Sequence, residues 1–230
     1  MAVELLWVEE GVCVPISRHP VAARSLLAQI AAKHAPTYRH MTRVAAYAEV
    51  FATHLRLSRR EVRMVSQAAL LHDIGKLEIA DAILAKPARL TDEEMRIMCS
   101  HAELGARILV RSPVLGDLSE TVHYHHEWYD GRGYPAGLAG ERIPWAARVI
   151  SICDAFDTMT TPRPYATPLP PSQGLEELER FAGTQFDPTL VQDFTLLVRS
   201  GGLKRWTLAP QQYPSQVRRP EPLALRLADG

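Results

Sequence analysis

The chain has 230 residues, 47% hydrophobic and 23% charged, a composition typical of a globular protein with one sizeable core. Its 26 basic and 26 acidic side chains balance, which excludes the broad positive surface of a non-specific nucleic-acid binder. No apolar run is long enough to span a membrane, and three widely separated cysteines, Cys13, Cys99 and Cys153, favour a reducing cytoplasm over a disulfide framework.

The beginning of the chain differs in pattern from the remainder. Two short apolar runs within residues 3–16, split by the letters EEG, predict a small β-hairpin. From Pro20 onward, apolar residues recur at helical spacing. A helix beginning near Pro36 is predicted to carry one stripe: His40, Val44, Tyr47 and Phe51.

Capping signals mark the later helices. Two capping boxes, SRRE at 58–61 and TDEE at 91–94, predict helices that run to about Asp73 and about Val110. Pro144 suits the first turn of another helix, because proline there sacrifices no helical hydrogen bond.

The last part of the chain is rich in proline. Residues 162–173 hold five prolines and are predicted to form a loop, after which Asp187 and Pro188 begin a final helix ending near Gly201. Residues 201–230 read as an extended Pro- and Arg-rich tail. The sequence therefore predicts an all-α fold divided into three parts: a short N-terminal element (1–19), a helical domain (20–200) and a C-terminal extension (201–230).

Five of the nine histidines stand in contexts that suit metal binding: His40, His72, His101, His125 and His126. Imidazole nitrogens and carboxylate oxygens are ligands for divalent first-row metals. His72 is followed directly by Asp73, and Gly75 is expected to end the helix. His72 and Asp73 are therefore expected at the C-terminal end of that helix, with Lys76 just beyond it. A lysine there suits a phosphoryl oxygen.

Six segments in order resemble the signatures of HD-GYP domains, the subgroup of HD-superfamily metallophosphohydrolases that degrades cyclic di-GMP. They are LLHDIGK (70–76), KPARLTDEE (86–94), HAELGARIL (101–109), HHEWYDGRGYP (125–135), GERIPWAARVISICDAFDTMTTPRPY (140–165) and GTQFDP (183–188). The resemblance covers roughly residues 36–199 and implies an HD-superfamily helical bundle.

The resemblance also implies a metal shell, which falls on His40, His72, Asp73, His101, His125, His126 and Asp154. Iron or manganese is expected, with zinc, cobalt or nickel as alternatives. Three-metal members of the family carry a glutamate four residues before the first histidine, where this chain has Pro36. We therefore expect two divalent ions, with Asp73 bridging them.

The same resemblance implies residues that meet the substrate. Lys76 is expected to contact the scissile phosphate and, with Asp73, to take part in catalysis, and Arg163 is expected to hold a phosphate with its planar fork. The loop that carries Gly133, Tyr134 and Pro135 is called the GYP loop below. Gly133 is expected to shape its backbone, and Tyr134 either lines the nucleotide pocket or packs beneath it.

Two further residues have weaker assignments. Asp157 is expected either to receive a proton or hold a ligand histidine, or else to be a helix-surface acid paired with Arg163. His123 matches no ligand position but stands three residues before His126 and is a candidate for the surroundings of the metals. Asp154, considered alone, would equally suit a cap or a pair with Arg148.

The function expected from the resemblance is hydrolysis of cyclic di-GMP to linear pGpG, with a second cut giving GMP, through a water shared by two metal ions. One alternative is an HD hydrolase that acts on another cyclic dinucleotide or a nucleotide phosphate. Another is a non-catalytic adaptor whose GYP loop docks onto a cyclase domain or a regulatory protein.

Overall fold

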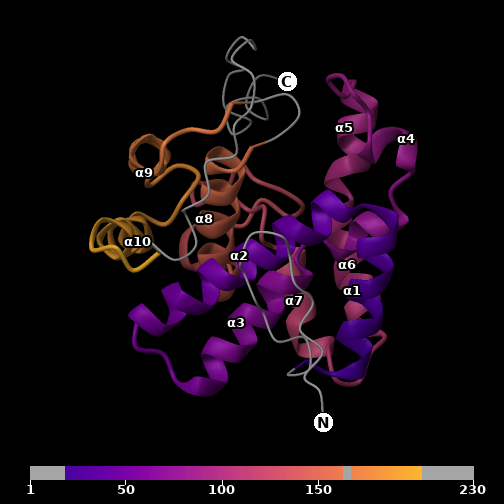
Figure 1. Ribbon diagram of the computed structural model, residues 1–230, viewed down its shortest axis with the longest axis horizontal. Coiled ribbons are helices and arrows are strands. Elements are labelled where there is room, and N and C mark those ends of the chain that lie inside the picture. Colours follow the sequence, from indigo (N-terminus) through magenta and orange to yellow (C-terminus); the bar gives the residue numbers. More distant parts are fainter. Residues whose placement is uncertain (1–18, 163–166, 204–230) are drawn as a thin grey trace.

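The computed structural model describes residues 19–162 and 167–203, which form a bundle of helices (Figure 1). The hairpin predicted for residues 3–16, Arg163 and nearly all of the predicted C-terminal extension lie outside these ranges. The elements are α1 (Val21–Lys33), α2 (Ala35–His54), α3 (Arg59–Leu71), η2 (Ile74–Glu78), α4 (Asp81–Leu84), α5 (Asp92–Cys99), α6 (His101–Val110), η3 (Gly116–Leu118), α7 (Ser119–His123), η4 (Gly140–Arg142), α8 (Trp145–Thr160), α9 (Pro171–Arg180) and α10 (Pro188–Arg199).

The expected all-α architecture is confirmed for the part of the chain that the structure describes. Apart from two isolated β-bridges, these residues form helices, turns and loops. Within the same ranges, none of the helices has the length and hydropathy needed to cross a membrane.

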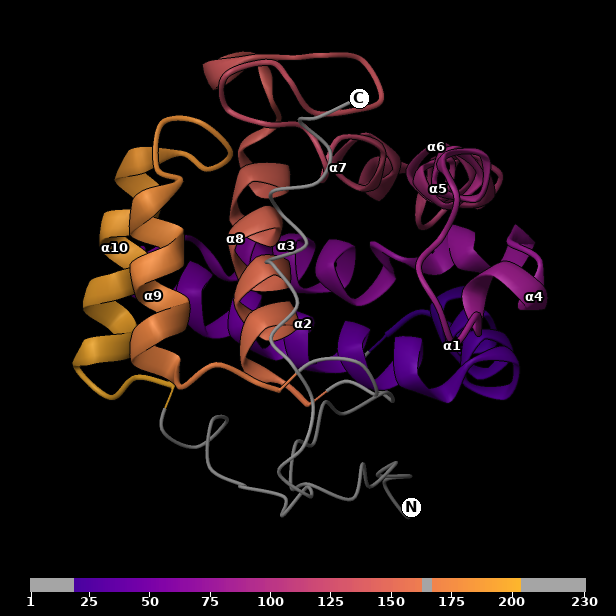
Figure 2. The ribbon, with the colours of Figure 1, turned by 90° about the horizontal axis from the view of Figure 1, so that it is seen from above.

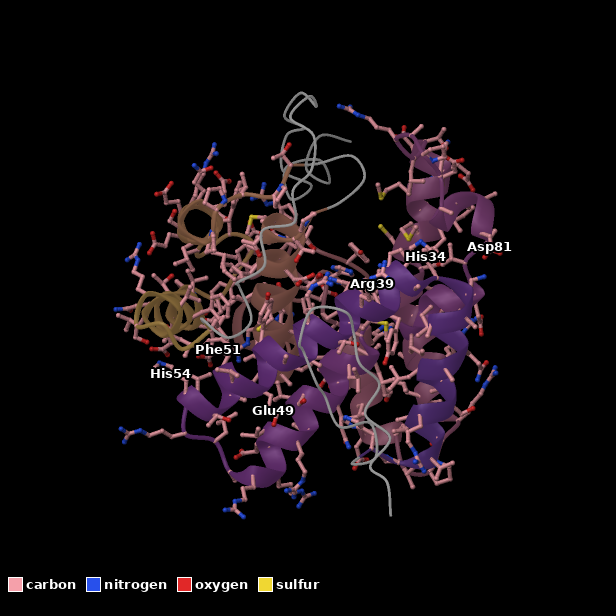
Figure 3. The ribbon with its side chains drawn as sticks, viewed as in Figure 1. His34, Arg39, Glu49, Phe51, His54 and Asp81 are labelled. Carbon is pink, nitrogen blue, oxygen red and sulfur yellow. The ribbon has the colours of Figure 1, made fainter. Side chains whose placement is uncertain are left out.

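Helix α2 lies at the centre of the bundle, packed against α1, α3 and α8, while α9 and α10 lie side by side against α8, and α10 also contacts α2 (Figures 1 and 2). It runs from His34, which caps its N-terminus, to His54 at its C-terminal end (Figure 3). The predicted stripe on α2 is buried throughout, which explains why this helix forms with its apolar side inward.

Aromatic rings fasten α2 to α8 and α10. The ring centroids of Tyr47 and Phe156 lie 5.9 Å apart, those of Phe51 and Phe194 5.1 Å, and those of Phe156 and Phe194 5.2 Å, all edge to face. Such pairs contribute about 0.5–1.5 kcal/mol each beyond the area they bury. They fix the position of α2 relative to α8, and these two helices carry four polar residues of the site described below.

The capping boxes occur as predicted, but the second one begins a shorter helix than expected. The side chains of Thr91 and Glu94 each accept a hydrogen bond from the other's backbone N–H, and α5 begins there. The prediction of one helix to about Val110 was wrong, because the chain turns at Ser100. The Ser100 N–H bonds back to the carbonyls of Arg96 and Ile97, and α6 starts at the next residue.

Two predictions near prolines and one near a glycine are also corrected. The proline-rich segment predicted as a loop up to residue 173 already contains the start of α9, whose first residue is Pro171. Pro144 is the N-cap of α8 rather than part of its first turn. Helix α3 ends at Leu71, before Gly75.

Gly75 is instead a point of close contact between η2 and α6. A Cβ atom added at Gly75 would lie 2.0 Å from the carbonyl oxygen of His101 and 2.5 Å from the backbone nitrogen of Gly105. Only glycine permits this approach. The contact brings the segment that holds Asp73 and Lys76 against the start of α6.

Candidate metal centre

Three of the predicted ligand histidines stand just beyond the ends of helices. His72 is the C-cap of α3, His101 follows α5 by two residues, and His125 follows α7 by two residues. The last carbonyls of a helix have no partner within it. In each case the histidine Nδ1 bonds the carbonyl oxygen three residues earlier, at 2.7 Å (Ala69), 2.7 Å (Met98) and 2.6 Å (Val122).

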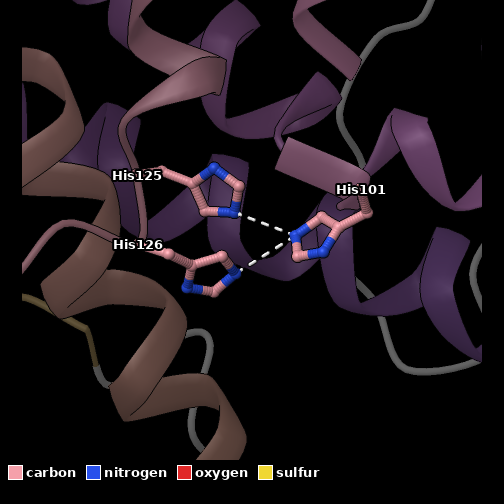
Figure 4. Close-up of side chains that lie close together, drawn as sticks. All are labelled: His101, His125 and His126. Atoms are coloured by element: carbon pink, nitrogen blue, oxygen red, sulfur yellow. Dashed lines mark hydrogen bonds between the residues drawn. The ribbon is translucent and has the colours of Figure 1, made fainter. Parts of the chain in front are cut away.

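These bonds determine the tautomer of each neutral ring. Because Nδ1 donates its hydrogen to a carbonyl, Nε2 carries a lone pair and no hydrogen. The Nε2 atom of His101 lies 3.4 Å from that of His125 and 3.1 Å from that of His126 (Figure 4). The Nε2 atom of His72 is buried and has no hydrogen-bond partner among the described residues. The lone pairs of His101 and His125 therefore face each other with no hydrogen between them, as the free ring nitrogens of metal-binding histidines do.

The ligand atoms form two groups, each lying within 4.8 Å: His101, His125 and His126 in one, and His40, His72 and Asp73 in the other. Asp73 joins them. Its Oδ1 lies 3.3 Å from Nε2 of His101, whereas its Oδ2 lies 3.6 Å from Nε2 of His72 and 3.9 Å from Nε2 of His40. The carboxylate therefore presents one oxygen to each group, as a bridging ligand would.

The seventh predicted ligand also lies at this place. Asp154, on α8, has its Oδ1 3.0 Å from Nε2 of His40, and Thr158 donates a hydrogen bond to the same oxygen at 3.3 Å. It does not pair with Arg148, whose guanidinium bonds Asp187. The structure thus gathers all seven predicted ligands into one cluster, in which His126 and Asp154 are half-buried and the other five are buried.

Burial and neighbouring charges shift the pKa values within the cluster. Burial lowers the pKa of His101 to about 4, and burial together with His101 lowers that of His126 to about 3. Burial likewise lowers the pKa of His125 well below its usual value. These rings are therefore neutral near pH 7, the form in which imidazole binds a metal.

The carboxylates are held in the charged form. Burial alone would raise the pKa of Asp73, but Lys76 and the histidines around it keep that pKa well below its usual range. The Lys76 Nζ atom lies 2.6 Å from Oδ2 of Asp73. Burial would lower the pKa of His40, yet its hydrogen bonds to Asp154 and Asp157 raise it. The neutral imidazoles of His101, His125 and His126, beside ionised carboxylates, are donors that fit divalent first-row cations.

The GYP loop lies directly beside the histidine group. Tyr134 stacks on His126, with ring centroids 4.9 Å apart. A Cβ atom added at Gly133 would lie 2.2 Å from the backbone nitrogen of Trp128, so the loop folds back onto its own start. Glu127 is buried and accepts hydrogen bonds from the backbone N–H groups of Ala136 (2.6 Å) and Leu138 (3.0 Å).

The two weaker assignments have different outcomes. Asp157 is fully buried, its Oδ2 lies 2.7 Å from Nδ1 of His40, and it is bound by Arg43. It is therefore not a helix-surface acid. His123 instead lies edge-on against Tyr124, with ring centroids 4.6 Å apart. Sequence reasoning missed Arg43, although its place three residues after His40 on α2 was a signal.

Comparison with known proteins identifies the fold and the family. Residues 25–190 match the HD domain family. The chain belongs to this family. That result confirms the resemblance carried by the six motifs.

The most informative similarities are to bacterial phosphodiesterases. The HD domain is 40% identical over 163 residues to a cyclic di-GMP phosphodiesterase of Thermotoga maritima, covering 70% of this chain and 44% of that protein. It is 39% identical over 165 residues to 3′3′-cGAMP-specific phosphodiesterase 2 of Vibrio cholerae, covering 71% of this chain and 32% of that protein. The chain thus spans less than half the length of these curated relatives.

Among solved structures, the fold resembles the HD domain of the phosphodiesterase PgpH from Listeria monocytogenes, crystallised with cyclic-di-AMP. The TM-score is 0.59 at 20% identity, and the match covers 82% of this chain and all of that domain. At this level of identity the likeness concerns the fold.

Proposed function

We propose that this HD domain is a metal-dependent phosphodiesterase that hydrolyses cyclic di-GMP to linear pGpG. The observation that carries the proposal is the pair of ligand groups joined by the single carboxylate of Asp73, with Lys76 alongside. The cyclic di-GMP phosphodiesterase of Thermotoga maritima, at 40% identity, supports the choice of reaction and substrate.

Two divalent ions, iron or manganese first and zinc, cobalt or nickel as alternatives, fit the donor set. His101, His125 and His126 would hold one ion and His40 and His72 the other, with Asp73 shared and Asp154 beside His40. Such ions, when bound, polarise a phosphoryl oxygen and lower the pKa of water. Pro36 lies in the first turn of α2 and offers no oxygen ligand from its side chain, which supports two ions rather than three.

The protein's own residues supply binding and charge. The Lys76 side chain is 20% exposed, so its ammonium group is available to a non-bridging phosphate oxygen as well as to Asp73. The Tyr134 ring stacks on His126, at the edge of the metal centre, where it would contact a bound nucleotide. We retain Arg163, outside the described residues, as a second phosphate-binding group.

A second candidate substrate is 3′3′-cGAMP. The similarity to 3′3′-cGAMP-specific phosphodiesterase 2 is nearly as high as that to the cyclic di-GMP enzyme, at 39% against 40% identity. A purely adaptor role is less well supported, because the seven ligand positions all hold competent side chains in one cluster, five of them buried and two half-buried. We also retain a cytoplasmic location, since the described cysteines, Cys99 and Cys153, are free thiols.

The test is direct. Protein reconstituted with Fe(II) or Mn(II) is incubated with cyclic di-GMP, 3′3′-cGAMP and cyclic-di-AMP, and the products are separated by chromatography. We expect cyclic di-GMP to be cleaved faster than the other two substrates, with pGpG as its first product. Chelator should abolish the reaction. Faster turnover of 3′3′-cGAMP would transfer the assignment to that substrate. No turnover of any of the three by a fully metal-loaded protein would refute it.

A further inference from the structure

His40 takes its orientation in a different way from His72, His101 and His125. Those three stand beyond helix ends, where free carbonyls accept their Nδ1–H groups. His40 lies inside α2, and the carbonyls one turn before it accept hydrogen bonds from the helix's own N–H groups. The backbone therefore offers His40 no acceptor, and a side chain must fix its ring.

That side chain is Asp157, on the facing helix α8. Its Oδ2 accepts a hydrogen bond from Nδ1 of His40 at 2.7 Å, so in the neutral ring that binds a metal the lone pair is on Nε2, the atom nearest Asp154 (3.0 Å). The Asp157 side chain is entirely buried. A buried carboxylate keeps one geometry only if its remaining lone pairs are also satisfied.

Arg43 satisfies them. Its Nε donates to Oδ1 of Asp157 at 2.7 Å and its Nη2 donates to Oδ2 at 2.9 Å, a two-pronged contact that a lysine cannot reproduce. Thr161 adds a hydrogen bond to Oδ1 at 3.1 Å. His40 and Arg43 are one turn apart on α2, and Asp154 and Asp157 are one turn apart on α8. The two residues on α2 therefore contact the two aspartates on α8 across the interface between these helices.

We propose that Arg43 is a positioning residue of the metal centre: by clamping Asp157, it holds His40 with Nε2 directed at Asp73 and Asp154. The inference rests on the proposed function only in requiring a divalent ion at this group, whatever substrate is cleaved. It assigns the Arg43–Asp157–His40 chain to one of the two ligand groups and leaves the His101–His125–His126 group outside its influence.

The experiment uses metal-free full chain titrated with Mn(II) by calorimetry, in wild type, Arg43→Ala and Arg43→Lys. Removing a residue that orients a ligand typically weakens metal affinity about 10–100-fold. We expect Arg43→Ala to weaken one of the two binding steps by this factor and to leave the other unchanged. Arg43→Lys keeps the charge but not the two-pronged contact. At the weakened step, its Mn(II) affinity should therefore lie between that of wild type and that of Arg43→Ala.

Arg148→Ala is the matched control. Arg148 is also a buried arginine bound to an aspartate, Asp187, with side chains 13% and 6% exposed, compared with 15% and 0% for Arg43 and Asp157. Its loss should lower the melting temperature while both Mn(II) steps stay as in wild type. A second readout is the ¹⁵N spectrum of the metal-free protein at a pH where the His40 ring is neutral, in which Arg43→Ala should convert His40 from one tautomer to a mixture.

The outcomes separate this inference from the phosphodiesterase assignment. Wild-type Mn(II) binding in Arg43→Ala, or equal weakening in Arg148→Ala, would overturn the positioning role even in an active enzyme. Selective weakening would support it even if no cyclic dinucleotide were cleaved. If Arg43→Ala does not fold, Arg43→Lys decides: wild-type affinity and an unchanged His40 tautomer would refute the role.

Discussion

Replacing Gly75 by alanine should separate η2 from α6 and damage the candidate centre. The new Cβ would lie 2.0 Å from the His101 carbonyl oxygen and 2.5 Å from the Gly105 nitrogen, and both are backbone atoms that cannot rotate away. The two segments would have to move apart by about 1 Å or more to reach ordinary contact distances. Overpacking of this kind costs about 3 kcal/mol, the upper end of the usual range.

The expected results follow from that shift. For a chain of this size, the melting temperature should fall by roughly 6–12 °C. Asp73 lies two residues before Gly75 and Lys76 directly follows it, so both would move away from His101. At present Oδ1 of Asp73 lies 3.3 Å from Nε2 of His101. A misplacement of about 1 Å lowers turnover roughly 10²-fold.

The assay pairs thermal unfolding with steady-state turnover of cyclic di-GMP at 25 °C, where the variant should remain folded. Gly116→Ala is the control, because a Cβ there would meet nothing within 4 Å. It should leave stability within about 0.5 kcal/mol of wild type and activity unchanged. Wild-type melting and turnover in Gly75→Ala would show that the close contact between η2 and α6 is not as described.

Four further outcomes are expected. Lys76→Ala should retain both metal ions by elemental analysis while turnover falls roughly 10²–10³-fold, as for the loss of one charge-stabilising group; loss of metal would assign Lys76 to the shell instead. Asp73→Ala should remove metal and activity together, because its two oxygens face the two ligand groups, and a variant that keeps two tight ions would contradict the bridging role. Glu127→Gln should destabilise the GYP loop by about 1–3 kcal/mol, since an amide can accept from only one of the two N–H groups that Glu127 now binds; hydrogen exchange at residues 136 and 138 measures this, and wild-type protection there would count against it. In chelator, stability should fall as the pH drops from about 6.5 towards 4, by up to about 1.4 kcal/mol per pH unit each for His101 and His126, because the unfolded chain binds those protons first; denaturant titrations at pH 7 and pH 5 that agree would refute this.

Local signals in the sequence predicted most of the helix starts. The capping boxes at 58–61 and 91–94 and the Asp187–Pro188 pair act within one turn, so the sequence alone reveals them. The break at Ser100 contains neither proline nor glycine, and the start of α9 was hidden by prolines that also suit a loop. These two errors arose where local chemistry permits both structures and tertiary packing selects one.

The candidate site was predictable in its membership but not in its connections. The seven proposed ligands belong to motifs that can be recognised in the sequence itself, and the structure brings them together. The contact of Gly75 with His101, and the pairing of Arg43 with Asp157 across 114 positions, depend on how helices pack. Such pairings leave no local pattern, so residue spacing could not reveal them.

The 117 positions between His40 and Asp157 also set an order in time during protein synthesis. A ribosome adds about 5–20 residues per second, so α8 emerges roughly 6 to 23 seconds after α2. Throughout that interval His40 and Arg43 lack the carboxylate that orients them. The half of the centre that contains His40 is therefore completed only when α8 leaves the ribosome, and a nascent chain that pauses before residue 157 has no means of closing it.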